Sequence, residues 1–389
     1  MRITHRIPAI LMIVLILSCG APRDSVLMLE SKKISTEMLL DANPIVAGVQ
    51  LPDLSSIDPL ELSPEMKAFV DQYADRKMGQ PARLRNLIYA VMGEGTFDLI
   101  YDETTRTARE TFRDQLGNCL SFTNMFIAMS RYLGIEASFQ EVFIPPDWSM
   151  TGQFYIFSQH VNVYINLGSG LAGTDQIIDF NQYDFRSTYD RQIISDKRAR
   201  AHYFNNIGVE RMLAGDTALA FTNFRESIRE DKTFSPPWTN LGILSRQESF
   251  SDYAEAAYLK ALDDDSINLV AMSNLASLYE QNGRTELAEF YRNRVESHRM
   301  HNPYYRYQLA QTAFGNGDYD TSIDHLKFAI RKKKNDDSFY FLMSMNYLMK
   351  GEKIAAQNWM KKAAEIASKD IDKKRYHNKY DMLISSDDN

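Results

Sequence analysis

A single cysteine in the body of the chain is placed where a thiol could react. The chain has only two cysteines, and Cys119 follows Gly117 and Asn118 and precedes an apolar pattern of helical period. We therefore expect Cys119 to begin a helix. The N-terminus of a helix carries a partial positive charge and exposed N–H groups, which favour a thiolate over a thiol. The sequence predicts a candidate nucleophile at Cys119.

A base for this thiol is available on a strand-like segment. Of the seven histidines, only His160 lies in the same part of the chain as Cys119. Alternation in the run that starts at His160 places Asn162 on the same side of a strand. Asp179 follows two aliphatic residues in the next strand-like run, where a charge needs a partner. The order is a cysteine at a helix start, a histidine on one strand and an aspartate on the next.

Each of these residues also has a purely structural interpretation. A lone buried cysteine often packs as a small hydrophobe. A strand histidine can be a satisfied core residue, and an aspartate at a strand end can belong to a turn. It is the ordered set, with separations of 41 residues from Cys119 to His160 and 19 residues from His160 to Asp179, that favours a reactive site.

The elements that must position these residues indicate an α+β domain over residues 63–198. Ser63 followed by Pro64 is typical of a helix start. Helical patterns are expected from 63, from about 81, over 104–112 and over 119–133. Strand-like patterns cover 137–144, 154–166 and 176–180, with proline- and glycine-containing loops between them.

After about residue 198 the strands vanish and a period of 34 residues begins. Repeats align from positions 201, 235, 269, 303 and 337. The eighth position is small in each repeat: Gly208, Gly242, Ala276, Ala310 and Ser344. The fifteenth position reads Gly215, Ser249, Gly283, Gly317 and Gly351. The pattern resembles tetratricopeptide repeats, which implies an all-α solenoid of about five repeats over 199–370 and a C-terminal tail over 371–389.

The first nineteen residues resemble a bacterial lipoprotein signal peptide. A basic start and an apolar stretch precede Ile16-Leu17-Ser18-Cys19, and residue 20 is glycine. The resemblance implies that Cys19 is lipidated and that the protein is anchored in the cell envelope, with the outer membrane facing the periplasm favoured. The alternative is an ordinary secretory signal with an incidental cysteine. Residues 20–62 are expected to form a tether.

Residues of about 80 to 185 resemble the core of the transglutaminase-like superfamily, which is shared with papain-like peptidases. The matching segments are 107–111 leading to Gly117-Asn118-Cys119, then 131–137, then His160 and Asp179. The resemblance implies that Cys119 attacks an amide carbonyl, that His160 moves the proton and that Asp179 orients the imidazole. It also implies that Gln115 could donate to the oxyanion, although a surface turn residue explains Gln115 equally well.

Two functions remain open on this evidence. The first is a cysteine-dependent acyl-transfer enzyme that hydrolyses or transamidates an amide or peptide, with a repeat array that binds a protein partner or substrate. The second is a catalytically inert transglutaminase-like module in a scaffold protein of an envelope or secretion complex. A formal charge of -7 argues against nucleic acid as a partner. The absence of metal-ligand spacings and of a glycine-rich phosphate loop predicts no metal and no cofactor, and membrane contact is expected through the lipid on Cys19.

Overall fold

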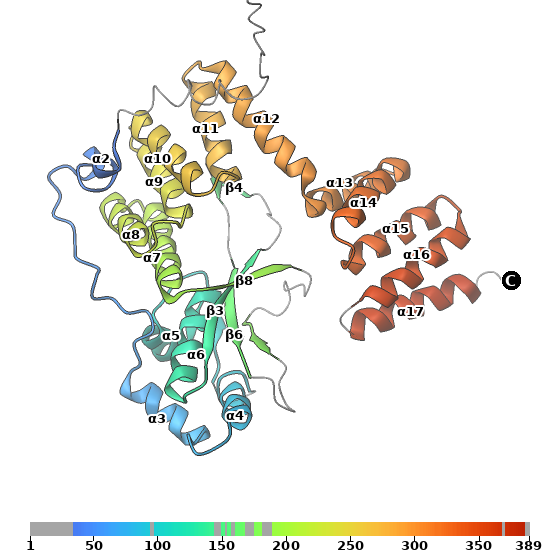
Figure 1. Cartoon of the computed structure of the whole chain (residues 1–389), viewed down its shortest axis with the longest axis horizontal. Helices are drawn as coiled ribbons and strands as arrows, with labels where there is room; N and C mark the ends of the chain where they lie inside the picture. The colour runs from blue at the N-terminus through green and yellow to red at the C-terminus, as the bar shows by residue number, and fades with distance from the viewer. Residues whose placement is uncertain are drawn as a thin grey trace, which may run out of the picture.

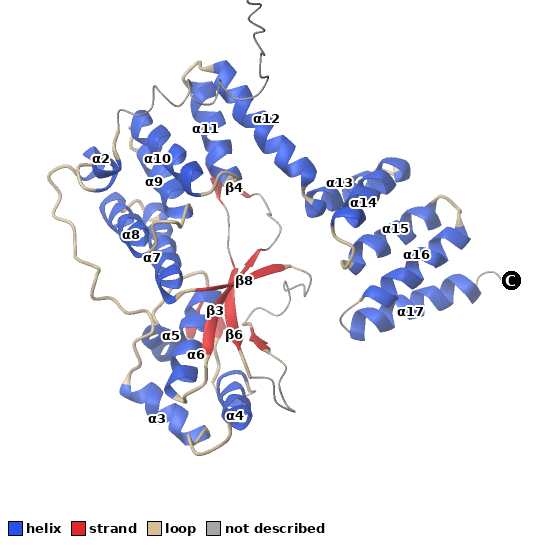
Figure 2. Cartoon of the chain, viewed as in Figure 1, coloured by secondary structure: helices blue, strands red, loops and turns tan. Residues whose placement is uncertain are grey.

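The chain forms an α+β domain followed by an array of paired helices (Figures 1 and 2). The computed structural model describes residues 34–93, 97–143, 149–151, 154–156, 160–167, 175–180, 189–367 and 370–385. The predicted fold class is confirmed. The signal peptide expected at 1–19, with Cys19, lies outside the described residues.

The α+β domain is built on a four-stranded antiparallel sheet in the order β7-β6-β3-β8. Its strands are β3 (Ala137–Phe143), β6 (His160–Ile165), β7 (Gln176–Ile178) and β8 (Asp190–Ile194). Two short pairs accompany it: β1 (Ile100–Tyr101) with β2 (Leu116–Gly117), and β4 (Ser149–Thr151) with β5 (Phe154–Ile156). The helices are α3 (Pro64–Tyr73), α4 (Gln80–Met92), α5 (Ala108–Asp114) and α6 (Cys119–Tyr132).

Helix α6 is the centre of this domain. Eleven of its fourteen residues are buried, so it is enclosed on nearly all sides rather than along one stripe. The sheet register places Val161 and Val163 in the core with α6, while His160 and Asn162 lie on the alternate face. The helix begins at Cys119, as predicted, and the rest of the helix is held in place by its burial.

Two strand predictions differ from the structure. The single strand expected over 154–166 is two strands, because β5 pairs with β4 and β6 begins at His160. Strand β8 was not predicted, because its residues are half-exposed or exposed and two of its five are charged. An edge strand of this kind lacks the apolar alternation that marks a buried strand.

The helix pairs follow the 34-residue period. The first helices of the repeats are α7 (Asp196–Leu213), α9 (Pro236–Gln247), α11 (Leu269–Gln281), α13 (Pro303–Gly315) and α15 (Asp337–Met349). The second helices are α8 (Thr217–Glu230), α10 (Ser251–Asp264), α12 (Thr285–His301), α14 (Tyr319–Lys332) and α16 (Lys353–Ile366). A Cβ atom on Gly208 would lie 2.5 Å from the ring of Phe224, which explains the small eighth position. The fifteenth position is left-handed in all five repeats, including Ser249 at φ 68°.

Helix α7 belongs to both parts of the molecule. Its residues Ala199, Tyr203 and Phe204 lie in the core around α6, while Met212 lies in the core of the repeats. Arg131, in the last turn of α6, binds Asp196, in the first turn of α7, through two contacts of 2.6 and 2.8 Å. The boundary expected between residues 198 and 199 thus falls inside a helix that the α+β domain needs.

The segment expected to be a tether is packed against both parts over its described residues. Helix α2 (Thr36–Leu40) and a 3-10 turn (Pro44–Val46) lie on the repeats, where Leu39 is 2% exposed. Further along, the carbonyl of Pro59 accepts a hydrogen bond from the N–H of Ala108 at 2.8 Å. Residues 34–62 therefore link the array to the α+β domain on the surface (Figure 1).

The repeats form two hydrophobic cores rather than one. The first spans α7 to α12 and the second spans α13 to α17 (Asp370–Ser385). Helix α17 lies in the expected tail, and its Tyr376 is buried and donates a hydrogen bond to Asp337 at 2.6 Å. The second block also touches β8, since Lys333 pairs with Asp190 at 3.1 Å.

Candidate active site

The cap of α6 fixes the position of Cys119. Asn118 is the N-cap, and its side-chain oxygen accepts hydrogen bonds from the N–H and hydroxyl of Ser121 at 3.0 and 2.9 Å. Gly117 must be small, because a Cβ atom there would lie 2.6 Å from Ser121 Cβ. Cys119 is a free cysteine and is partly exposed, at the first position of a helix whose start is fixed by this cap.

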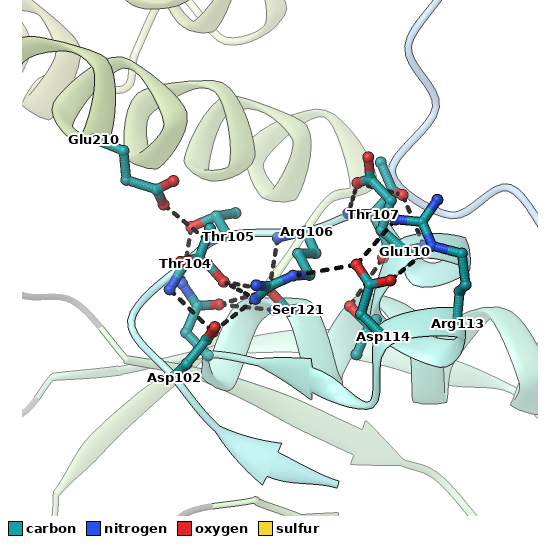
Figure 3. Close-up of polar contacts among 12 residues, drawn as sticks. Asp102, Thr104, Thr105, Arg106, Thr107, Glu110, Arg113, Asp114, Ser121 and Glu210 are labelled. Atoms are coloured by element: carbon teal, nitrogen blue, oxygen red, sulfur yellow. Dashed lines mark hydrogen bonds and ion pairs between the residues drawn. The ribbon is translucent and has the colours of Figure 1, made fainter. Parts of the chain in front are cut away.

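A chain of hydrogen bonds connects this cap to the repeat array, and its last link, between Thr105 and Glu210, is drawn in Figure 3. Asn118 Nδ2 donates to Thr105 Oγ1 at 2.8 Å, and the N–H of Thr105 donates to Glu210 Oε1 at 2.8 Å. Glu210 lies on α7, and its burial raises the pKa of its carboxyl, partly opposed by the bonds from Thr105. The first helix of the array therefore helps to hold the N-terminus of α6.

The loop before α5 is held by Arg106. Its guanidinium contacts Asp102 at 2.6 Å and Asp114 at 3.7 Å, and its backbone N–H donates to Ser121 Oγ at 2.8 Å (Figure 3). The side-chain hydrogen bond from Arg106 holds the pKa of Asp102 below its usual range. These bonds tie the loop before α5 to the first turn of α6.

His160 and Asp179 are brought together by neighbouring strands. His160 Nε2 lies 2.7 Å from Asp179 Oδ2, and their side chains are only 12% and 7% exposed. Asn162, on the same face of β6 as His160, donates from Nδ2 to the same carboxylate oxygen at 3.0 Å. Asp179 is thus held by two partners, and the imidazole of His160 also interacts with the Cys119 side chain.

The surroundings of His160 favour its charged form. Burial lowers the pKa of the imidazole, but hydrogen bonds with Asp179 and with the Cys119 side chain outweigh it and raise the pKa to about 10. A charged imidazole next to a thiol stabilises the thiolate that would form there. The structure thus brings together the three residues that the sequence singled out, in the arrangement that a cysteine nucleophile needs.

Gln115 is placed differently from the trio. It is the C-cap of α5, exposed, with a left-handed φ of 54°. Its backbone carbonyl accepts from the N–H of Ile100 at 2.9 Å, which joins β2 to β1. This is the turn position that the alternative interpretation described, and a role for its side chain in binding an oxyanion stays a prediction.

Several residues at the site were not singled out as functional from the sequence. Asn162 could have been found, because it shares a strand face with His160. Arg191 lies on β8, where it pairs with Val142 of β3, and it interacts electrostatically with Asp179. Burial lowers the pKa of its guanidinium. Glu210 carries no local sequence signal, because it is 105 residues away from its partner Thr105.

Two further observations concern ligands and membranes. Within the described ranges, no group of three or more histidine, cysteine, aspartate or glutamate side chains could hold a metal ion. No helix among the described residues is both long enough and apolar enough to cross a bilayer.

Residues 67–170 match the sequence model of the transglutaminase-like superfamily. This part of the chain is a transglutaminase-like domain. The match includes Cys119 and His160 and ends before Asp179.

The other likenesses are shorter or weaker. Curated relatives are the Photosystem I assembly protein Ycf3 from Prochlorococcus marinus strains MIT 9303 and MIT 9313, each 34% identical over 95 residues, which is 24% of this chain and 55% of the relative. The chain thus spans about half the length of the curated relatives it matches. Among solved structures, PilF from Pseudomonas aeruginosa is 15% identical, covering 50% of this chain and 88% of PilF with a TM-score of 0.27. MamA from Desulfovibrio magneticus RS-1 is 17% identical, covering 44% of this chain and 96% of MamA with a TM-score of 0.25.

Proposed function

We propose that the transglutaminase-like domain is an acyl-transfer enzyme that uses Cys119 as its nucleophile on an amide or peptide. The observation that carries this proposal is the 2.7 Å contact between His160 and Asp179, which holds a charged imidazole beside the Cys119 thiol. A purely structural histidine would not need both a buried carboxylate and a thiol as partners.

The reaction would proceed in two stages. The Cys119 thiolate attacks the amide carbonyl, and the tetrahedral intermediate collapses to a thioester as the amine leaves with a proton from His160. Water or a second amine then attacks the thioester, giving up a proton to His160, and the thiolate is released. Asp179 keeps the ring oriented and stabilises its charge through both stages.

The oxyanion would be bound at the start of α6. The backbone N–H of Cys119 lies in the first turn, where N–H groups have no partner inside the helix. The side chain of Gln115 is a candidate second donor, and it would have to turn toward the thiol from its exposed position.

The repeat array would recruit a protein partner or the substrate itself. Arrays of paired helices offer extended surfaces for this purpose. We extend the proposal to the whole chain as an envelope protein held at a membrane by a lipid on Cys19, with the outer membrane facing the periplasm as its location.

A second function is favoured by one specific observation. The transglutaminase-like domain is joined to the array through α7 and again through the pair Asp190–Lys333, so it could serve as a rigid part of a scaffold. In that case the domain would be inert and the array would carry out the function, as a module of an envelope or secretion complex.

The two functions are separated by the reactivity of Cys119. The full chain would be treated with iodoacetamide across pH 5 to 9, beside a His160→Ala variant, with Cys119→Ala as the blank. An enzyme is expected to show fast alkylation that extends to low pH and depends on His160. A slow reaction that is the same in His160→Ala would exclude a working cysteine–histidine pair and favour the scaffold. If the pair works, release of ammonia from glutamine-containing peptides is the first turnover assay.

A further inference from the structure

Three aromatic rings form a column beside the active site. Phe122 stacks on Phe180 with ring centroids 5.3 Å apart and planes at 29°, and Phe180 stacks on Tyr101 at 6.1 Å and 16°. The column starts in the core, where Phe122 is 1% exposed, and ends at the surface, where Tyr101 is 51% exposed. One face of Tyr101 is therefore covered by Phe180 while much of its ring is open to solvent.

Each ring belongs to a segment that carries part of the site. Phe122 lies three residues after Cys119, one turn along α6, and Phe180 directly follows Asp179. Tyr101 lies on β1 opposite Gly117, two residues before Cys119. Three separate segments of the chain therefore fix the position of the column relative to the thiol. In agreement with this placement, Cys119 is among the charged groups that, after burial, raise the pKa of the Tyr101 phenol.

A ring in this position is suited to bind a flat side chain. Aromatic rings attract one another in offset or edge-to-face arrangements, which adds to the gain from burying apolar surface. The support from Phe180 and Phe122 means that little side-chain freedom remains to be lost on binding. The acidic residues nearby, Asp102 and Glu103, contribute to the field at Tyr101 and disfavour an anionic ligand.

We propose that Tyr101 contacts the substrate and selects acyl donors that carry an aromatic side chain next to the reacting amide. This inference rests on the proposed function, since it names a substrate class for the Cys119 site. Tyr101 would form one wall of the acyl site, with its ring against the substrate ring and the thiol at the adjacent carbonyl.

The test compares two alkylating probes on the purified full chain. Iodoacetamide and its N-phenyl derivative alkylate Cys119 by the same displacement of iodide at a CH2 carbon, and only the second carries an aromatic ring. Free cysteine corrects for their intrinsic reactivity. We expect the native protein to prefer the aromatic probe by roughly two- to tenfold, the range that a single aromatic contact provides.

Variants at Tyr101 assign the preference to the ring. Tyr101→Phe keeps the ring and should keep the preference, while Tyr101→Ala and Tyr101→Leu should lose it; the preference is read in each variant as the ratio of the two probe rates, so that a change in the reactivity of the thiol itself cancels. Tyr89→Ala, which removes another exposed tyrosine of the same domain, is the matched control and should change nothing.

The outcomes separate this inference from the proposed function. If Cys119 reacts fast with iodoacetamide but shows no aromatic preference, or keeps the preference in Tyr101→Ala and Tyr101→Leu, then the role of Tyr101 is refuted and the enzyme is not. If Cys119 reacts with neither probe faster than free cysteine, both proposals fail together.

Discussion

Replacement of Asp179 by asparagine tests the chemistry of the site with the smallest change in shape. The native carboxylate oxygen Oδ2 accepts from His160 Nε2 at 2.7 Å and from Asn162 Nδ2 at 3.0 Å. In Asp179→Asn an amide oxygen can still accept one of these bonds, but the negative charge that stabilises the imidazolium is gone.

The expected size of the effect follows from this bond. A hydrogen bond to a charged group contributes about 1.5–3 kcal/mol, which corresponds to roughly 1–2 pKa units of the imidazole. The thiolate–imidazolium pair formed by Cys119 and His160 would lose stability relative to the neutral pair by the same amount. Its population should therefore fall by a factor of roughly 10 to 150.

The assay is the second-order rate of Cys119 alkylation by iodoacetamide between pH 5 and 9. We expect Asp179→Asn to lose the reaction at the acidic end and to regain it at high pH, where the thiol ionises without help from the imidazole. Asp175→Asn is the matched control, since Asp175 is an exposed carboxylate that accepts from the Tyr164 hydroxyl at 2.6 Å. Superimposable profiles of Asp179→Asn and the native protein, with equal urea midpoints, would refute the assignment of Asp179 to the reacting imidazole.

Three further predictions test the supports of the site and of the array. Glu210→Ala should lower the free energy of unfolding by about 1–3 kcal/mol and slow alkylation of Cys119, because the N–H of Thr105 loses its acceptor. Glu210→Gln keeps an acceptor oxygen, so urea titrations and rate measurements should show native stability and a native alkylation rate. Equal behaviour of the two variants would contradict this role of Glu210. Because the pKa of His160 is raised to about 10 in the folded chain, its contribution to stability is full below about pH 6.5 and is lost as the pH rises toward 10. Urea titrations of the native chain under reducing conditions should show this loss, and a smaller loss is expected in His160→Ala. Ser249→Gly should raise the free energy of unfolding of the array by up to about 1 kcal/mol in urea titrations, because serine at φ 68° is strained where the other four repeats carry glycine. A lower urea midpoint than that of the native chain would contradict this.

The period of the repeats was predictable because its constraints are local. A left-handed turn requires glycine at positions such as Gly283, and a close helix contact requires Gly208 or Gly242. The same requirements recur every 34 residues, so the sequence shows the same pattern in five repeats. The start of α6 at Cys119 was predictable for a similar reason, since Asn118 is a good N-cap and the helical period begins directly after it.

The supports of the site were not predictable, because they are long-range. The sequence places Cys119, His160 and Asp179 in order, but nothing local shows that Glu210 reaches Thr105 across 105 residues. The boundary expected at 198/199 falls inside α7 (Asp196–Leu213), and no local signal marks that helix as shared. The repeat period describes one face of α7, while Tyr203 and Phe204 on that helix pack against the transglutaminase-like domain.

The shared helix also sets an order of events during synthesis of the chain. When residues 63–195 have left the ribosome, α6 still lacks the wall that Ala199, Tyr203 and Phe204 provide, and Thr105 still lacks Glu210. Because domains fold as units, a chain that ends before residue 210 lacks part of the core and of the cap that hold Cys119. The candidate site at Cys119 is therefore completed by the first helix of the array.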